Sequence, residues 1–83
     1  MASYAARFNA AVAAELRGER GAQQITVEAL AEKAGMVKGT LLRYLNGKRD
    51  IPVPALAEIC QALGVDPGDV LDKASARVAA QQV

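Results

Sequence analysis

Residues 30–49 read LAEKAGMVKGTLLRYLNGKR, and they contain two short helical patterns separated by a turn. Apolar and small residues recur at helical spacing before Gly35 and again after Val37. Only Gly35, Met36 and Val37 separate the two patterns. A turn of about three residues that begins with glycine and joins two short helices is typical of a helix-turn-helix. The sequence therefore predicts one helix over 26–34, which Thr26 caps, and a second helix over 38–45.

The basic residues of this stretch lie toward its end. Residues 36–49 carry four bases and no acid, whereas residues 50–72 carry five acids and no base. The net charge of +1 therefore conceals a basic segment followed by an acidic one. Charge runs often only keep a surface hydrated, but basic patches also attract nucleic acid. The distribution of charge alone leaves both interpretations open.

Length and composition predict one all-α domain. A chain of 83 residues buries a single modest core, and its many alanines and 4% aromatic content favour closely packed helices over a sheet. Apolar spacing and capping residues predict three further helices, over about 3–17, over 54–63 and from Asp66 onward. The glycines of residues 18–25 predict a loop. The predicted fold is a five-helix bundle that contains a helix-turn-helix.

The residue inventory argues against several kinds of chemistry. A chain with no histidine and one cysteine cannot build a Cys/His metal site, a disulfide or a histidine-based triad. Cys60 lies on the apolar face of its helix, and Asp66 and Asp69 are better explained as helix-capping residues than as catalytic acids. No phosphate-binding glycine motif occurs. We therefore expect neither an enzyme nor a metal or cofactor site.

No apolar run approaches the length of about 20 residues that a membrane-spanning helix needs. The N-terminus also lacks the basic and apolar regions of a signal peptide. The sequence therefore predicts a cytoplasmic protein without a membrane partner.

The helix over 38–45 has two different sides. At 100° per residue, its apolar side consists of Leu41, Tyr44 and Leu45. The opposite side gathers Lys38, Gly39, Leu42, Arg43 and Asn46. Most of these are polar, so this side is expected to face outward. Leu42 among them has two interpretations that the sequence leaves equally open: contact with a thymine methyl group, or no contact with DNA, in which case it packs beside the preceding helix or is simply exposed.

At these residues the chain resembles the helix-turn-helix family of Cro and the lambdoid phage repressors. The shared pattern is a polar helix start, LA-x-K-x-G, a short turn, a recognition helix and N-G-K. It appears here as Thr26, Leu30-Ala31, Lys33, Gly35, the helix from Lys38, and Asn46-Gly47-Lys48. The likeness extends from about Val12 to Leu71. It implies a lambda-repressor-like five-helix fold that binds double-stranded operator DNA and regulates transcription, with a phage or prophage repressor as the expected type.

The resemblance also implies roles for individual residues. Contacts to base edges in the major groove are expected from Lys38, Gly39 and Arg43, although Gly39 has no side chain to offer. Leu42 joins these candidate base contacts because of its place on the outward side of the helix, and not because of the resemblance. Contacts to phosphates are expected from Thr26, Asn46, Lys48 and Arg49. Val27 stands where relatives often carry a phosphate-binding glutamine, so that contact is expected to be missing. Ala22–Gln24 looks like a short insertion that either lengthens a surface turn or reaches the DNA backbone.

The sequence leaves the assembly and one alternative function open. We expect a DNA-binding domain over 1–72 and a helical extension or linker over 73–83, where Val78 and Val83 are the sizeable apolar residues. We expect a monomer or a weak homodimer. The sequence is also compatible with a further domain that follows these residues. The alternative is a helical protein-interaction module, such as an antitoxin or an adaptor.

Overall fold

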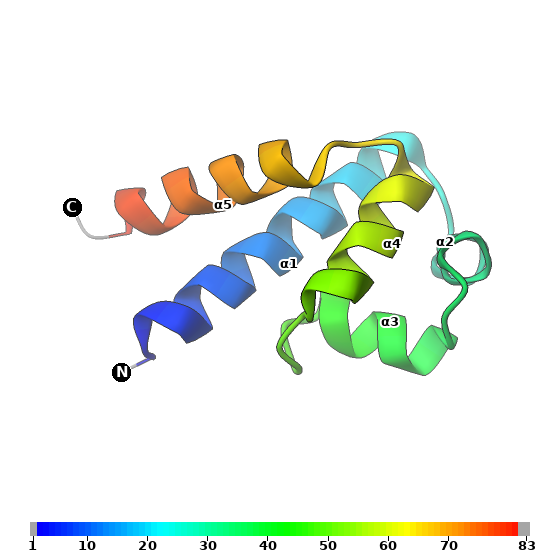
Figure 1. Ribbon diagram of the computed structural model, residues 1–83, viewed down its shortest axis with the longest axis horizontal. Helices are drawn as coiled ribbons and strands as arrows, with labels where there is room; N and C mark the ends of the chain where they lie inside the picture. Colours follow the sequence, from blue (N-terminus) through cyan, green and yellow to red (C-terminus); the bar gives the residue numbers. More distant parts are fainter. Residues whose placement is uncertain (1, 82–83) are drawn as a thin grey trace.

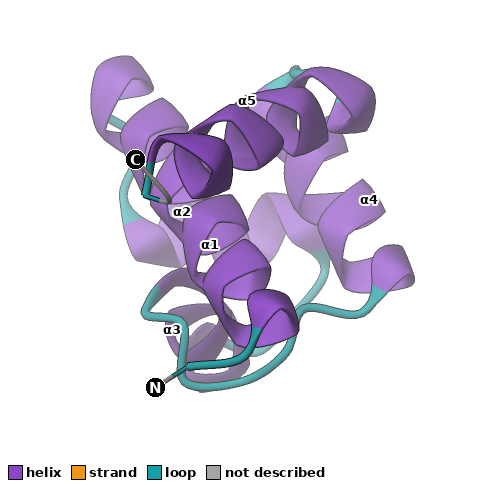
Figure 2. Ribbon diagram, turned by 90° about the vertical axis from the view of Figure 1, so that its left-hand side faces the viewer, coloured by secondary structure: helices purple, strands orange, loops and turns teal. Residues whose placement is uncertain are grey.

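The computed structural model describes residues 2–81 and consists of helices joined by short loops, with no strand in that range (Figure 2). This arrangement confirms the predicted all-α, five-helix fold. The helices are α1 (Tyr4–Gln23), α2 (Val27–Ala34), α3 (Lys38–Leu45), α4 (Val53–Leu63) and α5 (Pro67–Ala80). Within the described range, none of these helices is long and apolar enough to cross a membrane.

The long α1 is the element against which α3, α4 and α5 pack. α5 lies beside α1 and runs in the opposite direction, so that the two ends of the described chain lie at the same side of the molecule (Figure 1). The shorter α3 and α4 also pack on α1, and α2 packs against both of them. The helix-turn-helix formed by α2 and α3 therefore lies at the end of the molecule away from the termini (Figure 1).

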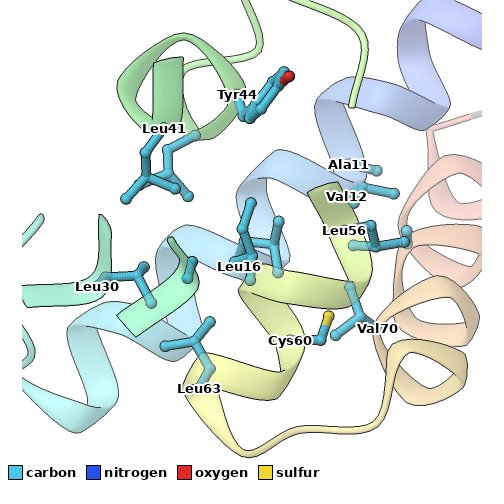
Figure 3. Close-up of a cluster of buried hydrophobic side chains, with 14 of the residues drawn as sticks. Ala11, Val12, Leu16, Leu30, Leu41, Tyr44, Leu56, Cys60, Leu63 and Val70 are labelled. Carbon is cyan, nitrogen blue, oxygen red and sulfur yellow. The ribbon is translucent and has the colours of Figure 1, made fainter. Parts of the chain in front are cut away.

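One hydrophobic core joins the five helices. Leu16 of α1, Leu30 of α2, Leu41 of α3 and Ile59 of α4 are all completely buried. They belong to a single cluster with Val70 of α5 (Figure 3). Burial of one such side chain contributes about 1.5–3 kcal/mol to folding. The core therefore fixes α3 through Leu41, Tyr44 and Leu45, which confirms the predicted inward side of that helix.

The helix ends follow the predicted capping chemistry. The hydroxyl of Thr26 accepts a hydrogen bond from the amide of Ala29 at 3.0 Å, and the carboxylate of Asp66 accepts one from the amide of Gly68 at 2.6 Å. Gly35 ends α2 with φ 68°, in the left-handed region where an L side chain is strained. These local signals fix where α2 ends and α3 can begin.

The prediction of a loop over 18–25 was wrong, because α1 continues to Gln23. A glycine inside a helix costs about 1 kcal/mol relative to alanine, but the neighbouring arginines, glutamate and alanine favour the helix. Gln23 then donates from Nε2 to the carbonyl of Leu63 at 2.7 Å, which ties the last turn of α1 to the end of α4. Ala22 and Gln23 therefore belong to the end of α1, and Gln24 is its exposed C-cap, with φ 56°.

The C-terminal helix continues across the predicted boundary between residues 72 and 73. Ala74 and Val78 of α5 belong to the buried core, whereas Leu71 is 37% exposed. Val83 lies outside the described residues. The division of the chain into a domain and an extension stays a prediction.

Candidate nucleic-acid interface

The outward side of α3 carries the residues that the sequence singled out. Lys38, Gly39, Arg43 and the cap residue Asn46 are exposed. Leu42 lies among them and is half-buried, outside the hydrophobic core. A single short helix therefore presents two cations, an amide and an apolar side chain on one surface. Both interpretations of Leu42 stay open.

The beginning of α3 carries no side-chain cap. Side chains of Ser3, Thr26 and Asp66 cap α1, α2 and α5, whereas the N-caps of α3 and α4, Val37 and Pro52, provide no side-chain hydrogen bond. Val37 is also 73% exposed. The first amides of α3 are thus free to meet an acceptor from outside the protein.

The first residue of α3 is a base, which the helix dipole disfavours at this end. Glu28 near the start of α2 offsets the unfavourable positive charge, because its Oε1 lies 3.1 Å from Nζ of Lys38. The hydrogen bond and the charge of Lys38 lower the pKa of the Glu28 carboxyl below its ordinary value. The turn therefore brings the beginnings of the two helices together on the exposed surface.

The basic loop that follows α3 is held by a residue of α1. Gly47 adopts φ 70°, and the amide of Lys48 donates to the carbonyl of Arg43 at 2.9 Å. Asn9 donates from Nδ2 to the carbonyl of Arg49 at 3.2 Å and accepts from the amide of Ile51 at 2.9 Å. Asn9 therefore fixes the backbone beside the exposed side chains of Lys48 and Arg49.

A second residue of α1 holds the end of α3 itself. Nη1 of Arg17 donates to the carbonyl of Leu45 at 2.5 Å. This contact satisfies a carbonyl that has no partner inside the helix and places a positive charge at the negative end of the dipole. The sequence predicted neither Arg17 nor Asn9 as a supporting residue. Both bonds join residues far apart in the chain, so no local pattern announces them.

The predicted phosphate-contacting residues fall at two ends of α3. Thr26 lies two residues before Glu28, which meets the beginning of α3, and Asn46, Lys48 and Arg49 follow its end. Eight helical residues span about 12 Å. The outward side of α3 is thus bordered by a helix start at one end and by a basic loop at the other.

Comparison with known proteins agrees with this geometry. A model of the family described as "Helix-turn-helix domain" matches residues 11–74. A crystal structure of the clp gene regulator ClgR from Corynebacterium glutamicum is 31% identical, with TM-score 0.79, and the match covers 84% of this chain and 91% of that chain. A second structure of ClgR is 32% identical, with TM-score 0.83 and coverage of 90% and 80%. The search of curated proteins finds no match. The chain therefore belongs to the helix-turn-helix domain family, a family of DNA-binding proteins.

Proposed function

We propose that this protein binds double-stranded DNA in a sequence-specific manner and places α3 in the major groove. One observation carries the proposal: the first residues of α3 are of types that do not stabilise the start of a helix. Its N-cap is an exposed valine without a capping bond, its first residue is a lysine, and its second is a glycine. Departures from local stability tend to mark functional surfaces. A DNA groove lined with base edges and phosphates would give contacts to the valine, the lysine and the backbone at the glycine.

Base recognition is assigned to Lys38, Leu42 and Arg43. Lysine and arginine donate to O6 and N7 of guanine, and a good contact of this kind discriminates by about 1–3 kcal/mol. A leucine beside them fits a thymine methyl group. Gly39 contributes by its lack of a side chain, since a Cβ at this position would meet no protein atom within 4 Å and the space is open for DNA. We expect a half-site that contains guanine.

Affinity is assigned to the two flanks of α3. Thr26 is exposed and caps the start of α2, where its hydroxyl accepts from the amide of Ala29, and the other first amides have no acceptor inside the helix. Asn46, Lys48 and Arg49 offer an amide and two cations on the loop that Asn9 holds. Contacts of this type attract DNA of any sequence and set the orientation of the protein on the duplex.

The mechanism is occupancy of an operator, by which the protein represses transcription without any chemistry on the DNA. The likeness to the clp gene regulator ClgR supports a regulatory role. The narrower resemblance to Cro and the phage repressors, and with it a role in phage immunity, stays a prediction, because the matched family is broader.

Selection of bound duplexes from a random pool tests the proposal. The selected sequences should share a guanine-containing motif, and symmetry in that motif would report on assembly. Arg43→Ala and Lys38→Met should each relax the preference at one position, while thermal unfolding stays unchanged. Random competitors that bind as well as the selected duplexes would refute sequence-specific recognition.

One feature favours the alternative of a protein-interaction module. An apolar groove of about 500 Å³ lies between the start of α1 and the start of α4, and its lining includes the exposed Tyr4, Val53 and Leu71. Dependence on salt separates the two functions. Release of counterions by the two phosphate-binding cations, Lys48 and Arg49, gives a log–log slope of binding against salt of about −2, whereas an apolar interface responds weakly.

A further inference from the structure

The ion pair between Glu28 and Lys38 connects the two helices of the helix-turn-helix on the surface assigned to DNA. Both side chains stay accessible, with exposed fractions of 67% for Glu28 and 54% for Lys38. Exposed ion pairs contribute little to the stability of a fold. The helix dipole favours an acid in the first turn of α2, where Glu28 lies. Neither effect requires contact with Lys38, and on this surface the acid would repel phosphates.

The chemistry of lysine indicates what the acid can do. A lysine ammonium is a mobile point charge on a flexible stem, so it binds phosphates as readily as bases. It carries three N–H donors, and the contact with Glu28 occupies one of them. The two that remain equal the number of acceptors, O6 and N7, that guanine presents in the major groove.

We propose that Glu28 is a positioning residue for Lys38: it keeps the ammonium away from phosphates and directs its remaining donors to guanine. Lys38 then discriminates between bases instead of only attracting DNA. This inference rests on the proposed function, because it assumes that α3 enters the major groove. The lowered pKa of Glu28 supports it, since the carboxyl stays charged at neutral pH.

Glu28→Gln is the variant that isolates this role. Glutamine keeps the size of the side chain but removes the charge that restrains Lys38. The freed ammonium should bind phosphates of any duplex, so binding to unrelated DNA should strengthen. Glu58→Gln on α4 is the matched control, because it changes the net charge equally at an exposed position outside the helix-turn-helix.

The measurement compares two duplexes of equal length and composition, one selected from a random pool and one with the same bases scrambled. For Glu28→Gln, the ratio of the two affinities should fall about two- to fivefold, the range expected for loss of an exposed ion pair. The salt slope for the scrambled duplex should steepen by about 0.9, which corresponds to one additional phosphate contact. Glu58→Gln should change neither quantity.

Two results would overturn the inference. In the first, Glu28→Gln strengthens binding to both duplexes equally, as a general effect of charge would. In the second, it lowers the ratio as much in a Lys38→Met background as in the wild type, so that its effect does not pass through Lys38. Failure of the proposed function looks different, because the wild type itself would then show no preference for the selected duplex.

Discussion

α1 spans 20 residues and α3 spans eight, and the polar side chains of the two helices make different kinds of contact. Arg17, Arg20 and Gln23 of α1 each donate to a backbone carbonyl of another segment. On α3, Lys38 instead meets an exposed acid, and Arg43 has no ion pair within residues 2–81. The polar residues of α1 thus hold the protein together, whereas those of α3 are available to a partner. Changes in the two helices should therefore affect different properties.

The largest expected effect is the loss of stability that follows replacement of a buried residue of α1. Leu16→Ala removes a completely buried side chain from α1 and should lower the free energy of unfolding by about 2–5 kcal/mol. Arg43→Ala removes an exposed side chain and should change it by less than about 0.5 kcal/mol, while binding to a selected duplex falls. Denaturant unfolding and DNA titration of both variants measure the contrast. A marked loss of stability in Arg43→Ala would show that α3 is not specialised for binding.

Arg17→Met tests whether α1 also positions α3. It removes the bond to the carbonyl of Leu45 and should destabilise the fold by about 1 kcal/mol. Affinity for DNA should fall as well, although Arg17 does not belong to the outward side of α3. Arg77→Met is the control, because it removes the same charge from a pair with Glu15 between α5 and α1. If the two variants bind DNA with equal affinity, a general effect of charge explains the loss, and Arg17 does not position α3 for binding.

The sequence predicted α2, the turn and α3 because local chemistry determines them. Thr26 caps a helix through an amide three residues later, and Gly35 supplies the left-handed conformation that ends it. The predicted end of α1 was wrong for the opposite reason. The bond from Gln23 to Leu63 joins residues 40 positions apart, and nothing near residue 23 indicates it.

Contacts between different helices were also missed at the candidate interface. Helical spacing was sufficient to separate the outward residues of α3 from Leu41, Tyr44 and Leu45, because one helix repeats regularly. It was not sufficient to reveal Glu28 as the partner of Lys38. That pair depends on the angle at which the turn sets one helix against the other, which the sequence pattern does not contain.

Two glycines in open surroundings provide a smaller and closely matched test. A Cβ added to Gly18 of α1 or to Gly39 of α3 would meet nothing within 4 Å. Gly18→Ala should stabilise the protein by about 0.5–1 kcal/mol, and Gly39→Ala by a similar or smaller amount near its helix start. Only Gly39→Ala should weaken binding to DNA, since its methyl group would occupy the space next to the bases. Unaltered binding by this variant would place the contact surface elsewhere.

The smallest expected effect is a change in the pKa of Glu28. A carboxyl whose pKa is lowered by folding stabilises the native state above its ordinary pKa, and that contribution disappears as pH falls through the lowered value. An NMR titration should therefore show a lowered pKa for Glu28 in the wild type and a return toward the ordinary value in Lys38→Met. Between about pH 6 and 8 the preference for a selected duplex should stay constant, because the chain has no histidine to titrate there. An unchanged pKa in Lys38→Met would mean that the pair does not persist in solution. Lys38 would then be as unrestrained as Arg43, and the two cations of α3 would have to be treated alike.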